Sequence, residues 1–213
     1  MTLDLTRGKL LGEEQKDKFT LIDVILLILM LVLLANIFIQ SVWLAPVKVS
    51  GTSMLQTLEN DDWLYMDKLK TPERGDVVVF KRNEKENYVK RIIALPGDSV
   101  KTVNGKVMVK KGKDGNWQTL DEPYAYYESG KLSGTYIPFT GADIPETVLG
   151  DDEMFVLGDN RWGSKDSREI GPVKMDTIIG VVPEWSIKYK EKYATYLDFI
   201  ERINLRIKEI FKK

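Results

Sequence analysis

The longest apolar run of the chain lies near its start, between Ile22 and Ile39. One charge, Asp23, stands at its edge, and apolar residues occupy all faces of the helix that the run would form. Such a helix would span about 27 Å, close to the ~30 Å hydrocarbon core of a bilayer. The pattern therefore predicts one transmembrane helix over residues 22–40.

Two other interpretations of this run are a buried core helix and a cleavable signal peptide. A core helix at the edge of a domain would carry a polar stripe, which this run lacks. A signal peptide needs small residues at positions −3 and −1, but a cut after Ala45 would place Trp43 at −3 and Pro46 directly behind the cut. We therefore interpret the run as a retained anchor.

Basic residues indicate the orientation of this anchor. Four of them lie within residues 1–21, and only Lys48 follows the run closely. Because cytoplasmic flanks carry the excess of Lys and Arg, we expect a cytoplasmic N-terminal segment over 1–21. The chain from residue 41 onward is then extracytoplasmic.

Behind the run, the pattern changes to short apolar segments separated by turn residues. Strands are expected over residues 62–67, 77–80, 88–95, 154–157 and 178–182. Asn104-Gly105 lies between two further strands and predicts a hairpin over 100–109. These elements predict a mostly β domain over 41–187, built as a coiled antiparallel sheet or a barrel, with a peripheral β region at about 99–153.

The last segment, residues 188–213, has a helical pattern. Apolar residues recur at spacings of three and four among many basic residues, at Tyr193, Tyr196, Ile200, Ile203, Ile207 and Ile210. This predicts an amphipathic, basic C-terminal helix. The sequence leaves open whether the helix packs on its own domain, lies on a membrane surface or binds a partner helix.

The composition restricts the chemistry. The 213 residues carry a formal net charge of −1, and no basic stripe with interleaved aromatic residues indicates a nucleic-acid partner. The chain contains no histidine and no cysteine, which excludes Ser-His-Asp triads, thiol proteases, disulfides and metal sites ligated by His or Cys. Nucleophilic chemistry would therefore use Ser, Thr, Lys, Asp, Glu or Tyr. We expect no metal and no cofactor.

Three segments concentrate polar groups beside apolar strands: Gly51 to Leu58, Lys90 to Asp98 and Gly158 to Gly171. They resemble three boxes of the bacterial type I signal peptidases, which read G-x-S-M-x-P-T-L, K-R-I/V-I-x-L-P-G-D and G-D-N-R-x-x-S-x-D-S-R-x-x-G. Arg74 to Phe80 and Asp121 to Tyr124 also fit, so the resemblance covers roughly residues 20 to 185. The compact size and single span are similar to the Gram-positive form of the family.

The resemblance implies a serine endopeptidase of the bacterial cell membrane. Such an enzyme removes N-terminal signal peptides from secreted preproteins after small residues (Ala-x-Ala), through an acyl-enzyme. The roles that the resemblance implies are nucleophile for Ser53, general base for Lys90, orientation of the lysine for Ser164, support of the site for Asp159, Asp166 and Arg168, and substrate binding for Gly51, Met54 and Val89.

The residue pattern itself is consistent with a lysine base. A lysine accepts a proton only when neutral, and at a pKa of about 10.4 roughly one in 2,500 is neutral at pH 7. Burial disfavours the charged form and lowers the pKa. In a strand, Lys90 shares a face with Tyr88 and Ile92, which is an apolar setting, whereas Arg91 points to the opposite face.

One position departs from the family pattern, because Gln56 stands where proline is usual. Together with the C-terminal helix, this departure keeps open a specialised pilin-processing or pilin-assembly protein of the same family, with pilins or other surface-protein precursors as partners. A self-cleaving repressor of the LexA type would also use a Ser-Lys pair. The predicted membrane span, and the lack of a pattern for a DNA-binding helix-turn-helix, argue against that repressor.

Overall fold

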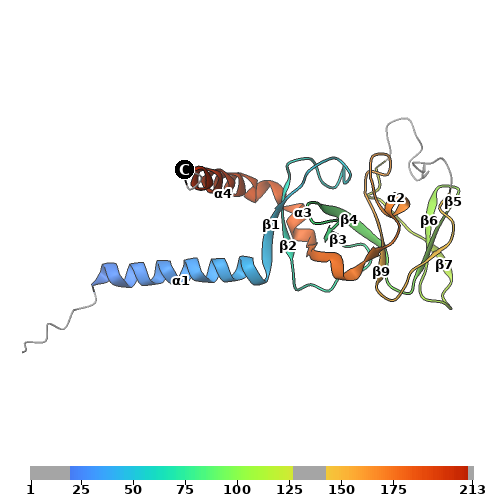
Figure 1. Ribbon diagram of the computed structural model, residues 1–213, viewed down its shortest axis with the longest axis horizontal. Coiled ribbons are helices and arrows are strands. Elements are labelled where there is room, and N and C mark those ends of the chain that lie inside the picture. The colour runs from blue at the N-terminus through green and yellow to red at the C-terminus, as the bar shows by residue number, and fades with distance from the viewer. Residues whose placement is uncertain (1–19, 127–142, 211–213) are drawn as a thin grey trace, which may run out of the picture. The chain divides into compact units, whose positions relative to one another are not determined.

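A computed structural model describes residues 20–126 and 143–210 (Figure 1). The predicted apolar helix is α1, Leu21–Val42, which is long and apolar enough to cross a membrane. Thr20 and Asp23 cap its first turn, since the backbone N–H of Thr20 donates to the Asp23 carboxylate at 2.8 Å and the backbone N–H of Asp23 donates to Thr20 Oγ1 at 3.3 Å. The chain divides after Phe38 into this helix and a second compact unit from Ile39 onward.

The second unit contains a seven-stranded antiparallel sheet with the strand order β1-β2-β11-β3-β4-β9-β10. The bounds of its strands are β1 Leu44–Lys48, β2 Trp63–Asp67, β3 Val77–Lys81, β4 Asn87–Ala94, β9 Glu153–Leu157, β10 Val173–Lys174 and β11 Ile178–Val182. All five isolated strands predicted from the apolar pattern are present in it.

Strand β1 was not predicted, because its residues continue the apolar character of the preceding helix and include Pro46. It lies at the edge of the sheet and pairs only with β2 among the described residues. An edge strand tolerates proline, since one side of its backbone needs no partner. This strand leads the chain from α1 directly into the loop that begins at Val49.

A smaller antiparallel sheet has the order β7-β6-β5-β8 and includes the predicted hairpin, which is formed by β5 and β6. Its strands are β5 Ser99–Val103, β6 Lys106–Lys110, β7 Trp117–Thr119 and β8 Thr147–Val148. Asn104 and Gly105 have φ of 50° and 75°, the positive values that a tight hairpin turn requires. The limits of 99–153 for a peripheral β region stay a prediction.

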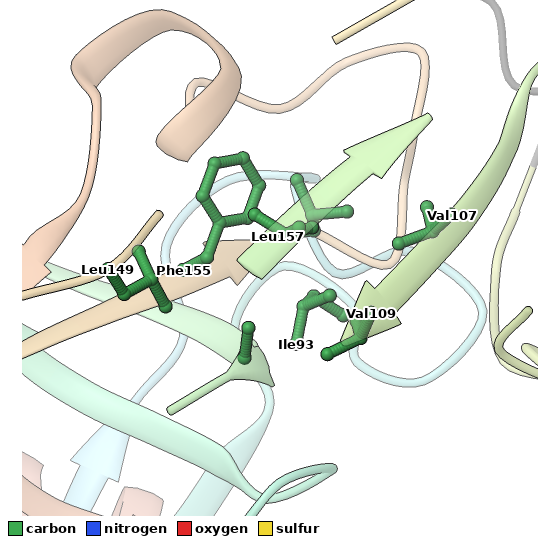
Figure 2. Packing of buried hydrophobic residues seen from close by; sticks show 8 residues of the cluster. Ile93, Val107, Val109, Leu149, Phe155 and Leu157 are labelled. Atoms are coloured by element: carbon green, nitrogen blue, oxygen red, sulfur yellow. The ribbon is translucent and has the colours of Figure 1, made fainter. Parts of the chain in front are cut away.

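The two sheets pack against each other through one hydrophobic cluster (Figure 2). Ile93 of β4 and Phe155 and Leu157 of β9 meet Val107 and Val109 of β6 there. The mostly β, antiparallel fold that the sequence predicted is therefore confirmed. The alternative prediction of a barrel is wrong, because both sheets are open in the part of the chain that the structure describes.

Four helical segments accompany the sheets in the described part of the second unit. They are α2 Ser167–Ile170, a 3₁₀ turn at Met175–Thr177, α3 Glu184–Lys188 and α4 Lys190–Ile210. The last of these is the predicted C-terminal helix. Its first half packs on β2 and buries Leu197, and Trp63 Nε1 donates to Asp198 Oδ1 at 2.8 Å.

Candidate active site

Ser53 and Lys90, which the sequence predicts as a catalytic pair, are in direct contact. Ser53 lies in the turn that follows β1, and Lys90 projects from β4. Lys90 Nζ donates to Ser53 Oγ at 2.7 Å and to the carbonyl of Val89 at 2.9 Å. The 2.7 Å separation is a distance at which a proton can pass between the two groups.

The environment of Lys90 favours its neutral form. Its side chain is only 3% exposed, and burial lowers its pKa from 10.5 to about 8, although Asp166 and Asp159 oppose that shift. The ring of Tyr88 lies 5.1 Å from Nζ, so the two residues share a face of β4 as the strand pattern predicts. At a pKa of 8 about one molecule in ten has a neutral lysine at pH 7.

Backbone hydrogen bonds hold the loop that carries Ser53. Asn160, at the end of β9, donates its backbone N–H to the carbonyl of Ser53 and its side-chain Nδ2 to the carbonyl of Thr52, both at 3.0 Å. Gly51 has a φ of 94°, which favours glycine, and its N–H donates to Asn60 Oδ1 at 2.8 Å. Sequence reasoning did not single out Asn60 or Asn160, although Asn160 belongs to the third box.

Ser164 packs against the loop that carries Ser53, and its backbone carbonyl accepts from Arg168 at 3.4 Å. Its Oγ is buried and has no partner among the described residues. A Cβ added to Gly158 would approach Ser164 Oγ to 2.1 Å and the carbonyl of Ser53 to 2.4 Å. Glycine at 158 therefore lets the third box pack against the nucleophile loop. The orientation of Lys90 by Ser164 stays a prediction.

Two ion pairs with fully buried carboxylates flank the site. Arg168 donates to both oxygens of Asp166, at 2.6 Å and 2.7 Å, and Asp166 also accepts from the backbone N–H of Gly158 at 2.9 Å. Arg91 donates to both oxygens of Asp159, at 2.9 Å and 2.6 Å. Two parallel hydrogen bonds fix each guanidinium in one plane. The supporting role of Asp159, Asp166 and Arg168 stays a prediction.

The second of these pairs extends into a network that sequence reasoning missed. Thr57 Oγ1 donates to Asp159 at 2.5 Å, which ties the nucleophile loop to the end of β9. Arg91 stacks on Tyr124 at 4.0 Å from the ring centre, and Arg161, which is 1% exposed, donates to both oxygens of Glu122. Glu122 and Tyr124 lie in the Asp-Glu-Pro-Tyr stretch, whose match to a family was the only signal for them.

A groove of about 340 Å³ opens at Ser53 and Lys90. Residues 47–54 line one side and residues 87–90 of β4 line the other. Gly51, Met54 and Val89, the predicted substrate-binding residues, are all among its lining residues. Met54 is buried beneath it at 1% exposure, and its sulfur lies 3.5 Å from the backbone nitrogen of Asp159. The substrate-binding roles stay a prediction.

Gln56 adopts a conformation that proline could not. Its φ is 72°, in the left-handed region, whereas the ring of proline fixes φ near −65°. Its side chain is exposed, and it is not among the residues that line the groove.

Replacing Gln56 with proline should therefore destabilise the chain. We expect Gln56→Pro to lower the free energy of unfolding by more than about 1 kcal/mol, because the native φ is incompatible with proline. Gln56→Gly, the matched control, should leave stability unchanged or raise it slightly, since glycine adopts positive φ without strain. Urea unfolding of the two variants tests this. A proline variant as stable as the glycine variant would contradict the assigned loop conformation.

Comparison with known proteins gives one consistent family. The sequence model of "Signal peptidase, peptidase S26" matches residues 21–185. Signal peptidase I of Bacillus caldolyticus is 40% identical over 144 residues, which is 63% of this chain and 74% of that protein. Signal peptidase IB of Staphylococcus aureus is 36% identical over 148 residues, which is 64% of this chain and 74% of that protein.

A crystal structure of a signal peptidase I from Enterococcus faecalis V583 is also similar. It is 29% identical, covers 54% of this chain and 98% of its own, and has a TM-score of 0.43. The family match extends over more than half of the chain, from the start of α1 to α3. The chain therefore belongs to the signal peptidase family, peptidase S26, as the three sequence boxes indicate.

Proposed function

We propose that this protein is a membrane-bound serine endopeptidase that removes signal peptides from secreted preproteins, with Ser53 as nucleophile and Lys90 as base. The observation that carries the proposal is the 2.7 Å contact between a buried lysine of lowered pKa and the serine hydroxyl, in a chain that has no histidine. The apolar helix α1 is the proposed anchor, with the N-terminus on the cytoplasmic side and the catalytic unit outside.

The chemistry follows from that contact. Lys90 Nζ takes the proton of Ser53 Oγ as the oxygen attacks the scissile carbonyl, and the backbone N–H of Ser53 stabilises the oxyanion. The protonated lysine then gives its proton to the leaving amine as the C–N bond breaks, which leaves an ester on Ser53. Neutral Lys90 next activates a water molecule, which hydrolyses that acyl-enzyme and releases the signal peptide.

This mechanism predicts a pH dependence. Only neutral Lys90 can act, and its pKa is lowered to about 8, so activity should rise about tenfold per pH unit below pH 8 and level off by about pH 9. Measuring kcat/KM on a model preprotein from pH 6 to pH 9 tests this. A flat profile across that range would exclude Lys90 as the base.

The groove supports a mode of substrate binding. An extended peptide between residues 47–54 and the edge near Asn87–Val89 would lie as an added strand, held by main-chain hydrogen bonds. The N–H of Gly51 already donates to Asn60 and the carbonyl of Val49 accepts from Asp61, so these two groups are not available to the peptide. Alternate side chains of a strand point the same way, which would direct positions −1 and −3 toward the enzyme.

A preprotein with Leu in place of Ala at −1 should therefore be cut at least about tenfold more slowly, because the buried Met54 and its apolar neighbours leave a shallow floor. The same change at −2 should have little effect, since that side chain would point to solvent. The measurement uses detergent-solubilised protein and a preprotein whose signal peptide ends in Ala-x-Ala. Equal sensitivity at −2 would refute strand addition while leaving the roles of Ser53 and Lys90 intact.

The pilin-processing alternative rested on Gln56 and on the C-terminal helix. Gln56 is exposed and lies outside the lining of the groove, so nothing about its position connects it with the choice of substrate. General signal peptide removal is therefore the function that we propose, and pilin precursors are not favoured over other preproteins.

A further inference from the structure

The two halves of α4 have different surroundings. In the first half, Tyr193 bonds to Ser186 and Leu197 is 4% exposed, so this half belongs to the domain. In the second half, which extends beyond the sheet (Figure 1), no residue is buried. Large apolar side chains that are between 38% and 69% exposed begin at Phe199, just before this half, and continue at Ile203, Leu205, Ile207 and Ile210, whereas Ile200 is half-buried.

Most of these exposed residues form one stripe. At 100° per residue, Tyr196, Phe199, Ile203, Ile207 and Ile210 fall on one side of the helix. We call these five residues the α4 stripe. Leu205 falls on the opposite side. Arg202 and Arg206 each precede a stripe residue and lie along one edge of the stripe.

Of the acidic residues in this region, Glu209 is exposed and lies off the stripe, whereas Asp198 and Glu201 bond to the domain. Asp198 accepts from Trp63, and Glu201 accepts from Lys48 Nζ at 3.1 Å. Both carboxylates therefore face β1 and β2, away from the stripe. The outward side of the helix is left apolar with a basic edge, which matches an anionic lipid surface better than a cationic or a neutral one.

Trp43 and the first half of α4 contact the same face of β2. Trp63, Tyr65 and Asp67 alternate onto one face of β2. Trp63 contacts α4 and Tyr65 contacts Trp185 of α3, whereas Asp67 accepts from Trp43 Nε1 at 3.0 Å, directly after α1. Trp43 is 48% exposed and Trp185 is 43% exposed, and half-exposed tryptophans are typical of membrane interfaces.

We propose that the α4 stripe docks on the surface of an anionic bilayer, the one in which α1 is anchored. The inference rests on the membrane anchoring in the proposed function. An anchored chain keeps α4 within reach of the bilayer, so even a short apolar face is held at high effective concentration. A coiled coil with a second copy is less favoured, because the free part of the stripe is shorter than the three to four heptads that such pairing needs.

The absence of cysteine allows a clean test with single labels. Full-length Ile207→Cys and Leu205→Cys, which replace side chains that are 45% and 54% exposed, would each carry an environment-sensitive dye. Both are reconstituted in vesicles of phosphatidylcholine with phosphatidylglycerol, with and without a lipid-attached quencher. We expect blue-shifted, quenchable emission at 207 and water-like emission at 205.

Three other results of the labelling experiment would contradict docking of the α4 stripe on the bilayer. Equal quenching at the two positions, or water-like emission at both, would overturn the proposal. A blue shift at 207 without lipid quenching, growing with protein density, would indicate a second copy instead and would also overturn it. Flotation of the same protein with the vesicles tests the anchor separately, and preprotein cleavage tests the peptidase, so failure of either is distinguishable from failure of docking.

The basic edge provides a second measurement. Replacing Arg202 and Arg206 with glutamine removes two cations from the edge of the stripe, and should weaken docking on anionic vesicles by roughly 30-fold. The matched control is pure phosphatidylcholine, on which the native and substituted chains should behave alike. If the substitution had the same effect on both lipids, the arginines would act through the fold of the helix and not through lipid charge.

Discussion

Replacing Ser53 with alanine should reduce preprotein cleavage by at least about 10⁴-fold while the fold is retained. The substitution removes the hydroxyl to which Lys90 Nζ donates, and its other hydrogen bond within the described residues is to a backbone carbonyl, which cannot act as the nucleophile. The fold should survive, since the backbone carbonyl of Ser53, and not its side chain, bonds to Asn160. Cleavage of a model preprotein, followed by gel electrophoresis, measures the loss.

Ser50→Ala is the matched control for this substitution. Ser50 is an exposed hydroxyl that lines the same groove, three residues before the proposed nucleophile. We expect it to keep activity close to that of the native chain. If Ser53→Ala were folded and cleaved at a near-native rate, or if Ser50→Ala were the inactive variant, the assignment of the nucleophile would be wrong.

The second large effect concerns Lys90→Met, which should lose activity and gain stability. Removing a general base typically lowers the rate by about 10²–10⁴-fold. The same lysine destabilises the folded chain, because burial lowers its pKa from 10.5 to about 8. That shift corresponds to a gain of up to about 3 kcal/mol in the free energy of unfolding of the methionine variant at pH 7.

The gain in stability should depend on pH in a defined direction. Below pH 8 the folded chain holds a buried charge and carries the full destabilisation. Between pH 8 and 10.5 the unfolded chain still binds a proton that the folded chain has lost, so the native chain becomes more stable as pH rises. Urea unfolding of both chains should show their difference shrinking across this window. A constant difference would mean that packing, and not the charge, separates them.

Much of the fold was accessible to sequence reasoning because the relevant signals are local. The apolar run at 22–39, the Asn104-Gly105 turn and the short strands each depend on a few neighbouring residues. Closure of the sheets is different, because it depends on pairing between distant strands. The apolar pattern of β1 and β10 does not show that, in the described structure, they are the edge strands of the larger sheet, each paired on one side alone.

The same difference between local and distant signals holds for the candidate site. Ser53 and Lys90 could be predicted because the chain lacks histidine and cysteine and carries two family boxes. The contacts of Asn160 with the carbonyls of Thr52 and Ser53 could not, since they join groups more than a hundred positions apart in the sequence. The left-handed conformation of Gln56 also leaves no mark in the sequence, because glutamine is not a residue that favours positive φ.

Alternation along β4 has a consequence for how the chain must fold. Lys90 faces the serine and Arg91 faces Asp159, so a slip of one residue against β3 would exchange them. The serine would then meet a guanidinium, which stays protonated at every physiological pH. The register is set at the turn between these strands, where Asn83 Oδ1 accepts from the backbone N–H groups of Lys85 and Glu86. A hairpin turn outside the groove thus bears on whether the sheet presents the proposed base to Ser53, and a misregistered molecule would retain its strands yet lack that base.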